Sequence, residues 1–389
     1  SYTGVNNLPL LVKNIALSLG DTMFVDSNTP GGYTLNLHST NTTTQTKINS
    51  QQWDYVVLQE QSQIPSLPQS ITGTDYSIPH SITLNNIIKS NFSCTETIFY
   101  LTWGRKNGDA SFCGQHPPVC TYDGMQQELR KTYMLMADTN KATISPVGIA
   151  WKNFREAYPT VELYTGDESH PSIQGSYLAA CVFYATLFQK SPIGATYIPS
   201  GIGTIDAFNI QTIASNTVLD SLDLWRINAN KPIADFSYSG NGMVNFTNIS
   251  TNSETYFWDF GDGNTSTLES PTNTFPGEGN YTVLLVTFSI DSCFSDTISK
   301  SVNVNSTGIN DITESSSFVI FPNPANKEVT IQTVEHYTSV NIIDVAGKAV
   351  KQFSKPKNGI DISSLTKGVY FVQLFNADEK LTTIKLVKD

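Results

Sequence analysis

The sequence predicts a multidomain protein in which an α/β domain with a parallel sheet precedes two small all-β sandwich domains. Residues 1–228 alternate helical and strand patterns, as α/β domains do. At Lys231-Pro232 the pattern changes to short strands separated by Gly, Asn and Asp, which is typical of a β-sandwich. A polar segment follows, and a second stretch of short strands closes the chain. The predicted boundaries are 1–228, 231–305, a linker at 306–316, and 317–389.

The first domain contains helices and strands in alternation. Apolar residues at helical spacing predict a helix over residues 6–19. The remaining predicted strands cover 23–25, 54–58, 97–101 and 143–149, and the remaining helices 125–138, 173–188 and 211–227. Strands that alternate with helices form a parallel sheet with helices on both faces, and its ligand site lies beyond the carboxyl ends of the strands.

Composition narrows the class of protein. A net charge of −11 and a pI of about 4.9 argue against nucleic acid or an anionic membrane surface as partner, since both need basic patches. No apolar run is long enough to predict a membrane span. Abundant Asn, Thr and Ser favour an extracellular protein. No cofactor motif occurs, and no cysteine spacing predicts a metal site.

The five cysteines predict at least one free thiol. Cys113 and Cys120 lie close together in a loop, which predicts a local disulfide, and Cys181 lies in an apolar helix as a buried residue. The chain opens at Ser1 without an initiator Met or a signal peptide, so we expect the natural N-terminus to lie upstream.

A candidate catalytic pair lies just before the apolar segment 173–188. Asp167 stands three residues before His170, and a carboxylate that orients a histidine is the base half of a nucleophilic hydrolase. Alternatively, Asp167 caps the following helix and His170 is an ordinary turn residue. Ser1 precedes the first helix, where backbone N–H groups favour a developing anion. A plain N-cap serine or a disordered terminus is the alternative for Ser1.

Four blocks in this order resemble the SGNH/GDSL hydrolases, above all a bacterial subgroup whose nucleophile motif reads Gly-Asn-Ser-Tyr-Thr. The blocks are Ser1-Tyr2-Thr3, Pro30-Gly31-Gly32-Tyr33-Thr34-Leu35, Val56-Val57-Leu58-Gln59-Glu60-Gln61-Ser62 and Asp167-Glu168-Ser169-His170-Pro171. The resemblance covers residues 1–228. It implies a flavodoxin-like, three-layer α/β sandwich with a parallel sheet.

The resemblance also implies roles for individual residues. Ser1 would attack an ester carbonyl, His170 would move the proton, and Asp167 would orient the imidazole. The oxyanion would bind the backbone N–H groups of Ser1 and Gly32, or Gly31 in its place, together with the side-chain amide of Gln61. Two departures stand out: Gln61 replaces the family's asparagine, and the Gly-Asn and central strand that precede the serine are absent.

Two further residues follow a predicted strand on the same side of the sheet. Arg105 could bind an anionic or hydroxyl-rich part of a substrate, or it could form a structural ion pair. Trp103 could stack on a sugar ring, or it could be a core residue.

The middle domain resembles a PKD domain through Phe257-Trp258-Asp259-Phe260-Gly261-Asp262-Gly263 and Gly279-Asn280-Tyr281-Thr282-Val283. Such domains are mostly spacers or interaction modules. Trp258 and Phe260 alternate inward with the period of a strand, and the glycines make the turn. The simpler interpretation of Asp259 and Asp262 is a role in that turn. The alternative is that they bind calcium.

The last domain resembles the C-terminal sorting domain of the Bacteroidetes type IX secretion system. Matching segments are Phe321-Pro322-Asn323-Pro324-Ala325, Ile343-Asp344-Val345-Ala346-Gly347, Ile360-Asp361-Ile362-Ser363-Ser364-Leu365, Gly368-Val369-Tyr370 and Lys385-Leu386-Val387-Lys388. The resemblance implies export across the outer membrane by that machinery, with later removal of the domain.

We therefore expect a secreted or cell-surface serine esterase that acts on an ester-bearing small molecule or polysaccharide, for example as a deacetylase. The alternative is a non-catalytic surface binding or adhesion protein that retains the hydrolase fold. A Gly-Asn pair ahead of Ser1, preceded by an apolar run, would favour the enzyme.

Overall fold

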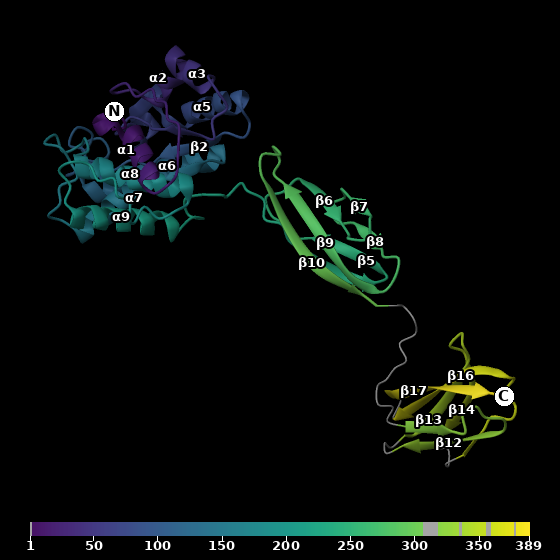
Figure 1. The fold of residues 1–389 in the computed structure, drawn as a ribbon. Coiled ribbons are helices and arrows are strands. Elements are labelled where there is room, and N and C mark those ends of the chain that lie inside the picture. Colours follow the sequence, from purple (N-terminus) through teal and green to yellow (C-terminus); the bar gives the residue numbers. More distant parts are fainter. Residues whose placement is uncertain (1, 306–317, 334–336, 355–358, 377–378) are drawn as a thin grey trace. The chain divides into compact units, whose positions relative to one another are not determined.

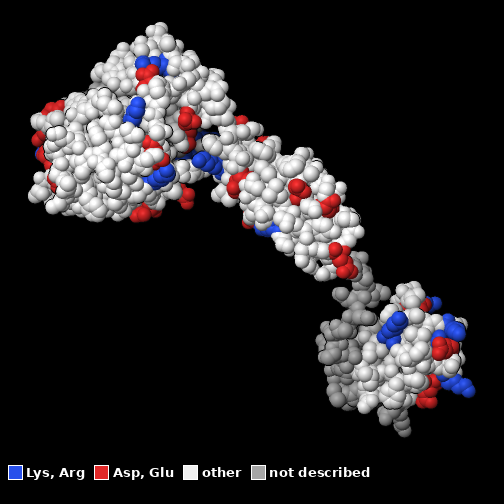
Figure 2. All heavy atoms as spheres, in the orientation of Figure 1, with Lys and Arg blue, Asp and Glu red and all other residues white. Residues whose placement is uncertain are grey.

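The computed structural model describes residues 2–305, 318–333, 337–354, 359–376 and 379–389. The chain forms two compact units, residues 1–304 and residues 305–389 (Figure 1). On the face drawn in Figure 2, Lys and Arg side chains are scattered among a majority of uncharged residues. The predicted class, an α/β domain followed by two β-sandwich domains, is confirmed.

The α/β domain is built on a three-stranded parallel sheet in the order β1-β2-β3. These strands are Tyr55–Leu58, Glu96–Tyr100 and Thr143–Ser145. The 3₁₀ turns are η1 (Val5–Asn7), η2 (Ile64–Ser66), η3 (Gly73–Asp75) and η4 (Pro117–Cys120). The helices are α1 (Leu8–Ser18), α2 (Leu35–Thr40), α3 (Thr42–Ile48), α4 (Gln69–Thr72), α5 (Ser77–Asn91), α6 (Tyr122–Asn140), α7 (Val147–Ala157), α8 (Ile173–Phe188) and α9 (Thr204–Leu219).

Two groups of helices enclose the sheet. Helix α8 packs against α1, α7 and α9, while α5 packs against α2, α3 and α6 (Figure 1). Every residue of α8 from Gly175 to Thr186 is buried, which explains why its sequence is apolar all round. Ser172 caps this helix by accepting a hydrogen bond from the backbone N–H of Gly175. The sheet and α8 belong to one hydrophobic core, to which α1, α5, α6, α7 and α9 also contribute.

Three predicted elements differ from the structure. Residues 23–25 belong to no strand, although their sequence is apolar. The strand predicted over 143–149 ends at Ser145, because Pro146 lacks a backbone N–H and α7 begins at Val147. The last helix covers Thr204–Leu219 rather than 211–227. Helices α5 and α7 were not predicted from the sequence.

The PKD-like region has seven strands in two antiparallel sheets. The strands are β4 (Phe236–Asn241), β5 (Met243–Asn248), β6 (Thr255–Asp259), β7 (Thr265–Ser266), β8 (Thr272–Thr274), β9 (Gly279–Phe288) and β10 (Ser295–Val304). The sheet orders are β4-β5-β8 and β10-β9-β6-β7. Trp258 and Phe260 are buried in the core between them. Asp259 and Asp262 accept backbone N–H groups of Gly261 and Asn264, so both have a role in the turn.

The second unit is a smaller β-sandwich. Its strands are β11 (Phe318–Phe321), β12 (Glu328–Thr333), β13 (Ser339–Ile343), β14 (Ala349–Ser354), β15 (Gly359–Asp361), β16 (Gly368–Asn376) and β17 (Glu379–Lys388). They form the sheets β11-β12-β15 and β14-β13-β16-β17. Alternating residues of β16, Tyr370, Val372 and Leu374, point into the core, as the period of a strand requires.

Two disulfides join described cysteines. Cys113 pairs with Cys120, as predicted, and Cys181 is a free, buried thiol. The second disulfide was not predicted: Cys94, in the loop between α5 and β2, pairs with Cys293, in the turn between β9 and β10. It links the α/β region to the PKD-like region across 199 residues of sequence.

Candidate active site

Asp167 and His170 lie together in a tight turn before α8. The turn is closed by the pairing of Tyr164 with Pro171. The Nδ1 atom of His170 lies 2.5 Å from Oδ2 of Asp167, whose other oxygen accepts the backbone N–H groups of Ser169 and His170 at 3.0 and 2.9 Å. One carboxylate therefore fixes both the ring and the turn. The helix-cap interpretation is wrong, because Ser172 caps α8.

The charge on Asp167 is held by its surroundings. Partial desolvation acts to raise its pKa, but hydrogen bonds from the His170 ring, the two backbone N–H groups and Thr165 outweigh it and lower the pKa well below the ordinary value. An ionised carboxylate can only accept, so the Nδ1 atom of His170 carries the hydrogen. The Nε2 atom is then the one that can take a proton, as a general base must.

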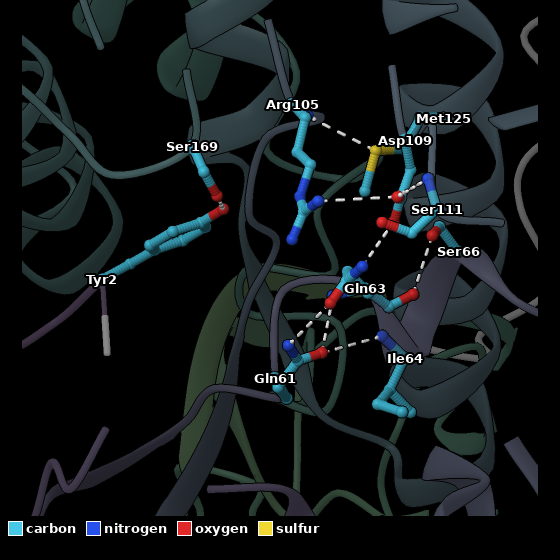
Figure 3. Close-up of polar contacts among 10 residues, drawn as sticks. All are labelled: Tyr2, Gln61, Gln63, Ile64, Ser66, Arg105, Asp109, Ser111, Met125 and Ser169. Atoms are coloured by element: carbon cyan, nitrogen blue, oxygen red, sulfur yellow. Dashed lines mark hydrogen bonds and ion pairs between the residues drawn. The ribbon is translucent and has the colours of Figure 1, made fainter. Parts of the chain in front are cut away.

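Ser1, the predicted nucleophile, lies outside the described residues. The next residue, Tyr2, contacts the turn that contains His170. The ring of Tyr2 is buried and lies perpendicular to the ring of His170, at 5.5 Å between centroids and an interplanar angle of 87°. Its hydroxyl is 2.8 Å from Oγ of Ser169, which lies beside His170 in the sequence (Figure 3). The residue after Ser1 thus contacts the turn that carries the candidate base.

Of the two roles predicted for Trp103, the structure supports that of a core residue. Its side chain is fully buried, and its faces stack on Tyr2 at 4.5 Å and Trp151 at 3.7 Å between ring centroids. No face is left for a sugar ring. Its indole N–H donates to the backbone carbonyl of Ser169 at 3.0 Å. Trp103 is therefore a core residue that supports Tyr2 and the Asp167–His170 turn.

The two predicted oxyanion donors line the same cavity as His170. This cavity has a volume of about 660 Å³, and Gly32, Gln61 and Arg105 also line it. Gly32 has a φ of +70°, a left-handed conformation that suits glycine. Among the described residues, no heavy atom outside Gly32 and its two chain neighbours lies within 4 Å of the position that a Cβ atom would take. The amide oxygen of Gln61 accepts the backbone N–H groups of Gln63 and Ile64, which fixes the orientation of the amide (Figure 3).

Gln59 and Glu60 have roles that the sequence analysis did not assign. The Gln59 amide oxygen accepts the backbone N–H and the hydroxyl of Thr3, so it anchors the chain just after the predicted nucleophile. The buried carboxylate of Glu60 accepts the backbone N–H groups of Leu35 and Gln61 at 2.9 and 2.7 Å. It thereby joins the loop of Gly32 to the end of β1.

Burial dominates the electrostatics of Glu60. Desolvation raises its pKa to about 7, although the two backbone hydrogen bonds act in the opposite direction. One of its carboxylate oxygens, Oε2, has no hydrogen-bond partner among the described residues. The signal in the sequence that could have identified this residue is a carboxylate directly after an apolar strand.

Arg105 lies at the cavity in front of a buried carboxylate. Its Nη1 atom is 3.5 Å from Asp109, which is fully buried and also accepts from Gln63 at 2.6 Å and from the backbone N–H of Ser111 at 3.0 Å (Figure 3). The Cys113–Cys120 disulfide lies in the loop that follows Asp109. The structural ion pair expected as one alternative is therefore present, and the partly exposed guanidinium still faces the cavity.

The structure thus brings His170, Gly32, Gln61 and Arg105 to one cavity, with Asp167 behind His170, and excludes Trp103 from it. Within the described ranges, no cluster of His, Cys, Asp and Glu could hold a metal ion. None of the described helices is long and apolar enough to cross a membrane.

Several solved structures are similar to parts of this chain, and three of them are described here. A DUF4886 family protein from Bacteroides uniformis is 20% identical over 54% of this chain and 88% of that chain, with a TM-score of 0.45. A proposed SGNH hydrolase from Slackia heliotrinireducens is 26% identical over 48% and 94%, with a TM-score of 0.38. The PKD1 domain of the Vibrio cholerae metalloprotease PrtV is 31% identical over 20% and 99%, with a TM-score of 0.19.

Comparison with curated proteins gave no match. Two family models do match parts of the chain: the PKD domain over residues 232–304 and the secretion system C-terminal sorting domain over residues 319–389. Both predicted resemblances are confirmed. The chain therefore carries a PKD domain and a type IX sorting domain, and it is a secreted or cell-surface protein.

Proposed function

We propose that the α/β domain is a serine esterase in which Ser1 is the nucleophile, His170 the general base and Asp167 the group that orients it. The observation that carries the proposal is the Asp167–His170 hydrogen bond, together with the packing of the Tyr2 ring against His170. A nucleophile, a base and a group that orients the base are the parts that acyl transfer requires. The four sequence blocks resembling SGNH/GDSL hydrolases support the same roles.

In the proposed reaction, His170 takes the hydroxyl proton of Ser1 through Nε2 as the hydroxyl attacks the ester carbonyl. The proton then passes to the leaving alcohol, and water releases the acyl group by the same route. Asp167 stays ionised throughout, since its pKa is held low. Gly32 and Gln61 are the proposed oxyanion donors beside the backbone N–H of Ser1, and each such donor is worth about 3–4 kcal/mol in other hydrolases.

The substrate we propose is an ester borne by a polysaccharide, such as an acetyl ester. Arg105 would bind an anionic or hydroxyl-rich group of that polymer, because its guanidinium faces the cavity and has several donors. A PKD domain beside the hydrolase domain is consistent with a polymer substrate.

Hydrolysis of p-nitrophenyl acetate by the full-length protein tests the proposal. Ser1→Ala and His170→Ala should each abolish turnover. His80→Ala is a matched control, because His80 lies on α5 and does not line the cavity. Equal rates in the wild type, Ser1→Ala and His170→Ala would refute the esterase and favour the binding protein.

A further inference from the structure

One cationic side chain faces the part of the cavity that contains His170. Among the described residues that line the cavity, the Lys and Arg side chains are Lys47 and Arg105. Lys47 is bonded to Asp26 at 2.5 Å. Burial raises the pKa of Tyr2, and the positive charge of Arg105 acts in the opposite direction, so the guanidinium lies near the Tyr2 hydroxyl. Arg105 is therefore the cation that a substrate at His170 would meet.

A buried carboxylate already takes up the charge of that cation. Asp109 is fully buried, and its Oδ1 atom lies 3.5 Å from Nη1 of Arg105, whose side chain is 30% exposed. The same carboxylate accepts the side-chain amide of Gln63 at 2.6 Å and the backbone N–H of Ser111 at 3.0 Å. Burying a carboxylate is costly unless donors compensate it, and three donors do so here. Arg105 is thus one member of a fixed ion pair.

The surrounding loop fixes the position of Asp109. Its backbone carbonyl accepts the N–H of Cys113 at 3.0 Å, and the disulfide between Cys113 and Cys120 closes the same loop. Gln63, which donates to Asp109, accepts in turn from the side-chain amide of Gln61 at 3.2 Å (Figure 3). The carboxylate behind Arg105 is therefore held from two sides, and it is connected to a proposed oxyanion donor.

Carboxylates outnumber cations around this part of the cavity. Asp109 lies behind Arg105, and Asp167 lies behind His170. Arg105 offsets one of these two negative charges. The nearby polar residues that line the cavity are neutral hydroxyl and amide groups: Thr3, Gln61 and Ser62. An anionic group of a substrate would therefore meet an excess of negative charge, whereas a sugar hydroxyl would find uncharged partners and the donors of the guanidinium.

We propose that Asp109 makes this site select esters of neutral, hydroxyl-bearing sugars over esters of sugar acids, because it takes up the charge of Arg105 and leaves guanidinium N–H groups to donate to hydroxyls. The inference rests on the proposed esterase function and narrows its substrate class. A partner can be rejected by an uncompensated like charge as well as by shape. One uncompensated carboxylate about 8 Å away disfavours a substrate anion by about ten-fold or more. Asp109 is a positioning residue, since it acts through Arg105.

Two matched esters test this selection. They are methyl glucoside and methyl glucuronoside, each acetylated at the same single hydroxyl, which differ in a hydroxymethyl group against a carboxylate. At low salt the full-length protein should have a kcat/KM about ten-fold higher for the glucoside ester. Concentrated NaCl screens charges and should reduce this ratio to about two-fold. Shape selection would give a ratio that does not depend on salt.

Two substitutions should move the ratio in opposite directions. Asp109→Asn removes the negative charge and should bring the ratio close to one, chiefly by lowering KM for the glucuronoside ester. Arg105→Gln leaves Asp109 unpaired, so it should raise KM for both esters and increase the ratio. Asp220→Asn makes the same charge change at the exposed end of α9, away from the cavity lining, and should keep the wild-type ratio. Structural damage alone would affect both esters equally.

Binding of the same esters to His170→Ala, measured by isothermal titration calorimetry, separates the selection from the esterase. Tighter binding of the glucoside ester without turnover in the wild type would retain the selection and reject the esterase. Turnover with an equal or higher kcat/KM for the glucuronoside ester would reject the selection and retain the esterase. A preference that neither salt nor Asp109→Asn changes would also overturn the selection. Neither turnover nor binding of either ester would overturn both proposals.

Discussion

Replacing Glu60 by glutamine should change how stability depends on pH. In the folded protein Glu60 is fully buried, and burial raises its pKa to about 7 from an ordinary value of 4.5. The folded state therefore favours the protonated carboxyl. Glutamine is neutral at every pH, and its amide oxygen can accept the same backbone N–H groups of Leu35 and Gln61.

The sign and size follow from proton linkage. Between pH 4.5 and 7 the folded chain holds a proton at Glu60 that the unfolded chain releases, so the stability from this group is complete below about 4.5 and is lost as pH rises through 7. The difference between the pKa of Glu60 in the folded chain and its ordinary value corresponds to about 3 kcal/mol of unfolding free energy, at about 1.4 kcal/mol for each pH unit. About 2 kcal/mol of this loss falls between about pH 5.5 and 8.5, a range that avoids the isoelectric point.

Urea unfolding followed by tryptophan fluorescence measures the effect, since Trp103 and Trp151 are buried in the α/β core. Relative to the wild type, Glu60→Gln should gain about 2 kcal/mol of unfolding free energy from pH 5.5 to pH 8.5. Glu278→Gln, a change at an exposed turn, should follow the wild type. Parallel curves for the wild type and Glu60→Gln would refute the assignment of a raised pKa to Glu60.

Four further outcomes are expected. Asp167→Asn should lower kcat/KM for p-nitrophenyl acetate by about 10²–10⁴-fold with little change in KM, and an unchanged kcat/KM would contradict its orienting role. Trp103→Ala should lower the unfolding free energy by about 3–5 kcal/mol. A raised KM at unchanged stability would instead support the alternative in which Trp103 binds substrate. Replacing Cys94 and Cys293 by serine should lower the free energy of unfolding in urea by about 2–5 kcal/mol, because the disulfide between them is lost. A decrease under about 1 kcal/mol would contradict a stabilising disulfide at these positions. Deleting residues 318–389 should leave hydrolysis intact but stop export, which fractionation of cells and medium would detect.

The sequence predicted those features that local patterns encode. The apolar run at 173–188 became α8 with the predicted bounds, because a helix buried on all sides needs no polar face. The spacing of Asp167 and His170 likewise determined a contact within one turn. Helix α5 was missed because its sequence is rich in Ser and Asn, and only Leu84 and Ile88 among its large apolar residues are buried.

Features that depend on distant residues could not be predicted. The sequence alone allowed Trp103 to be either a core residue or a residue that stacks on a sugar ring. The deciding contacts come from Tyr2 and Trp151, which are distant in the sequence and stack on the Trp103 ring. Glu60 gave no sign of its raised pKa, because the burial that causes it comes from the folded domain. Residues 23–25 have the composition of a strand, but a strand exists only where a partner pairs with it.

The Cys94–Cys293 disulfide gives the chain an uneven covalent topology. The α/β domain and the PKD domain are joined twice, by the backbone near Lys231 and by this disulfide, so one cut in that backbone leaves them attached under oxidising conditions. All five cysteines precede residue 305, so the only covalent connection between the sorting domain and the preceding domains is the backbone. A protease that removes the sorting domain needs a single cut, and the same protease could not separate the other two domains without a reductant.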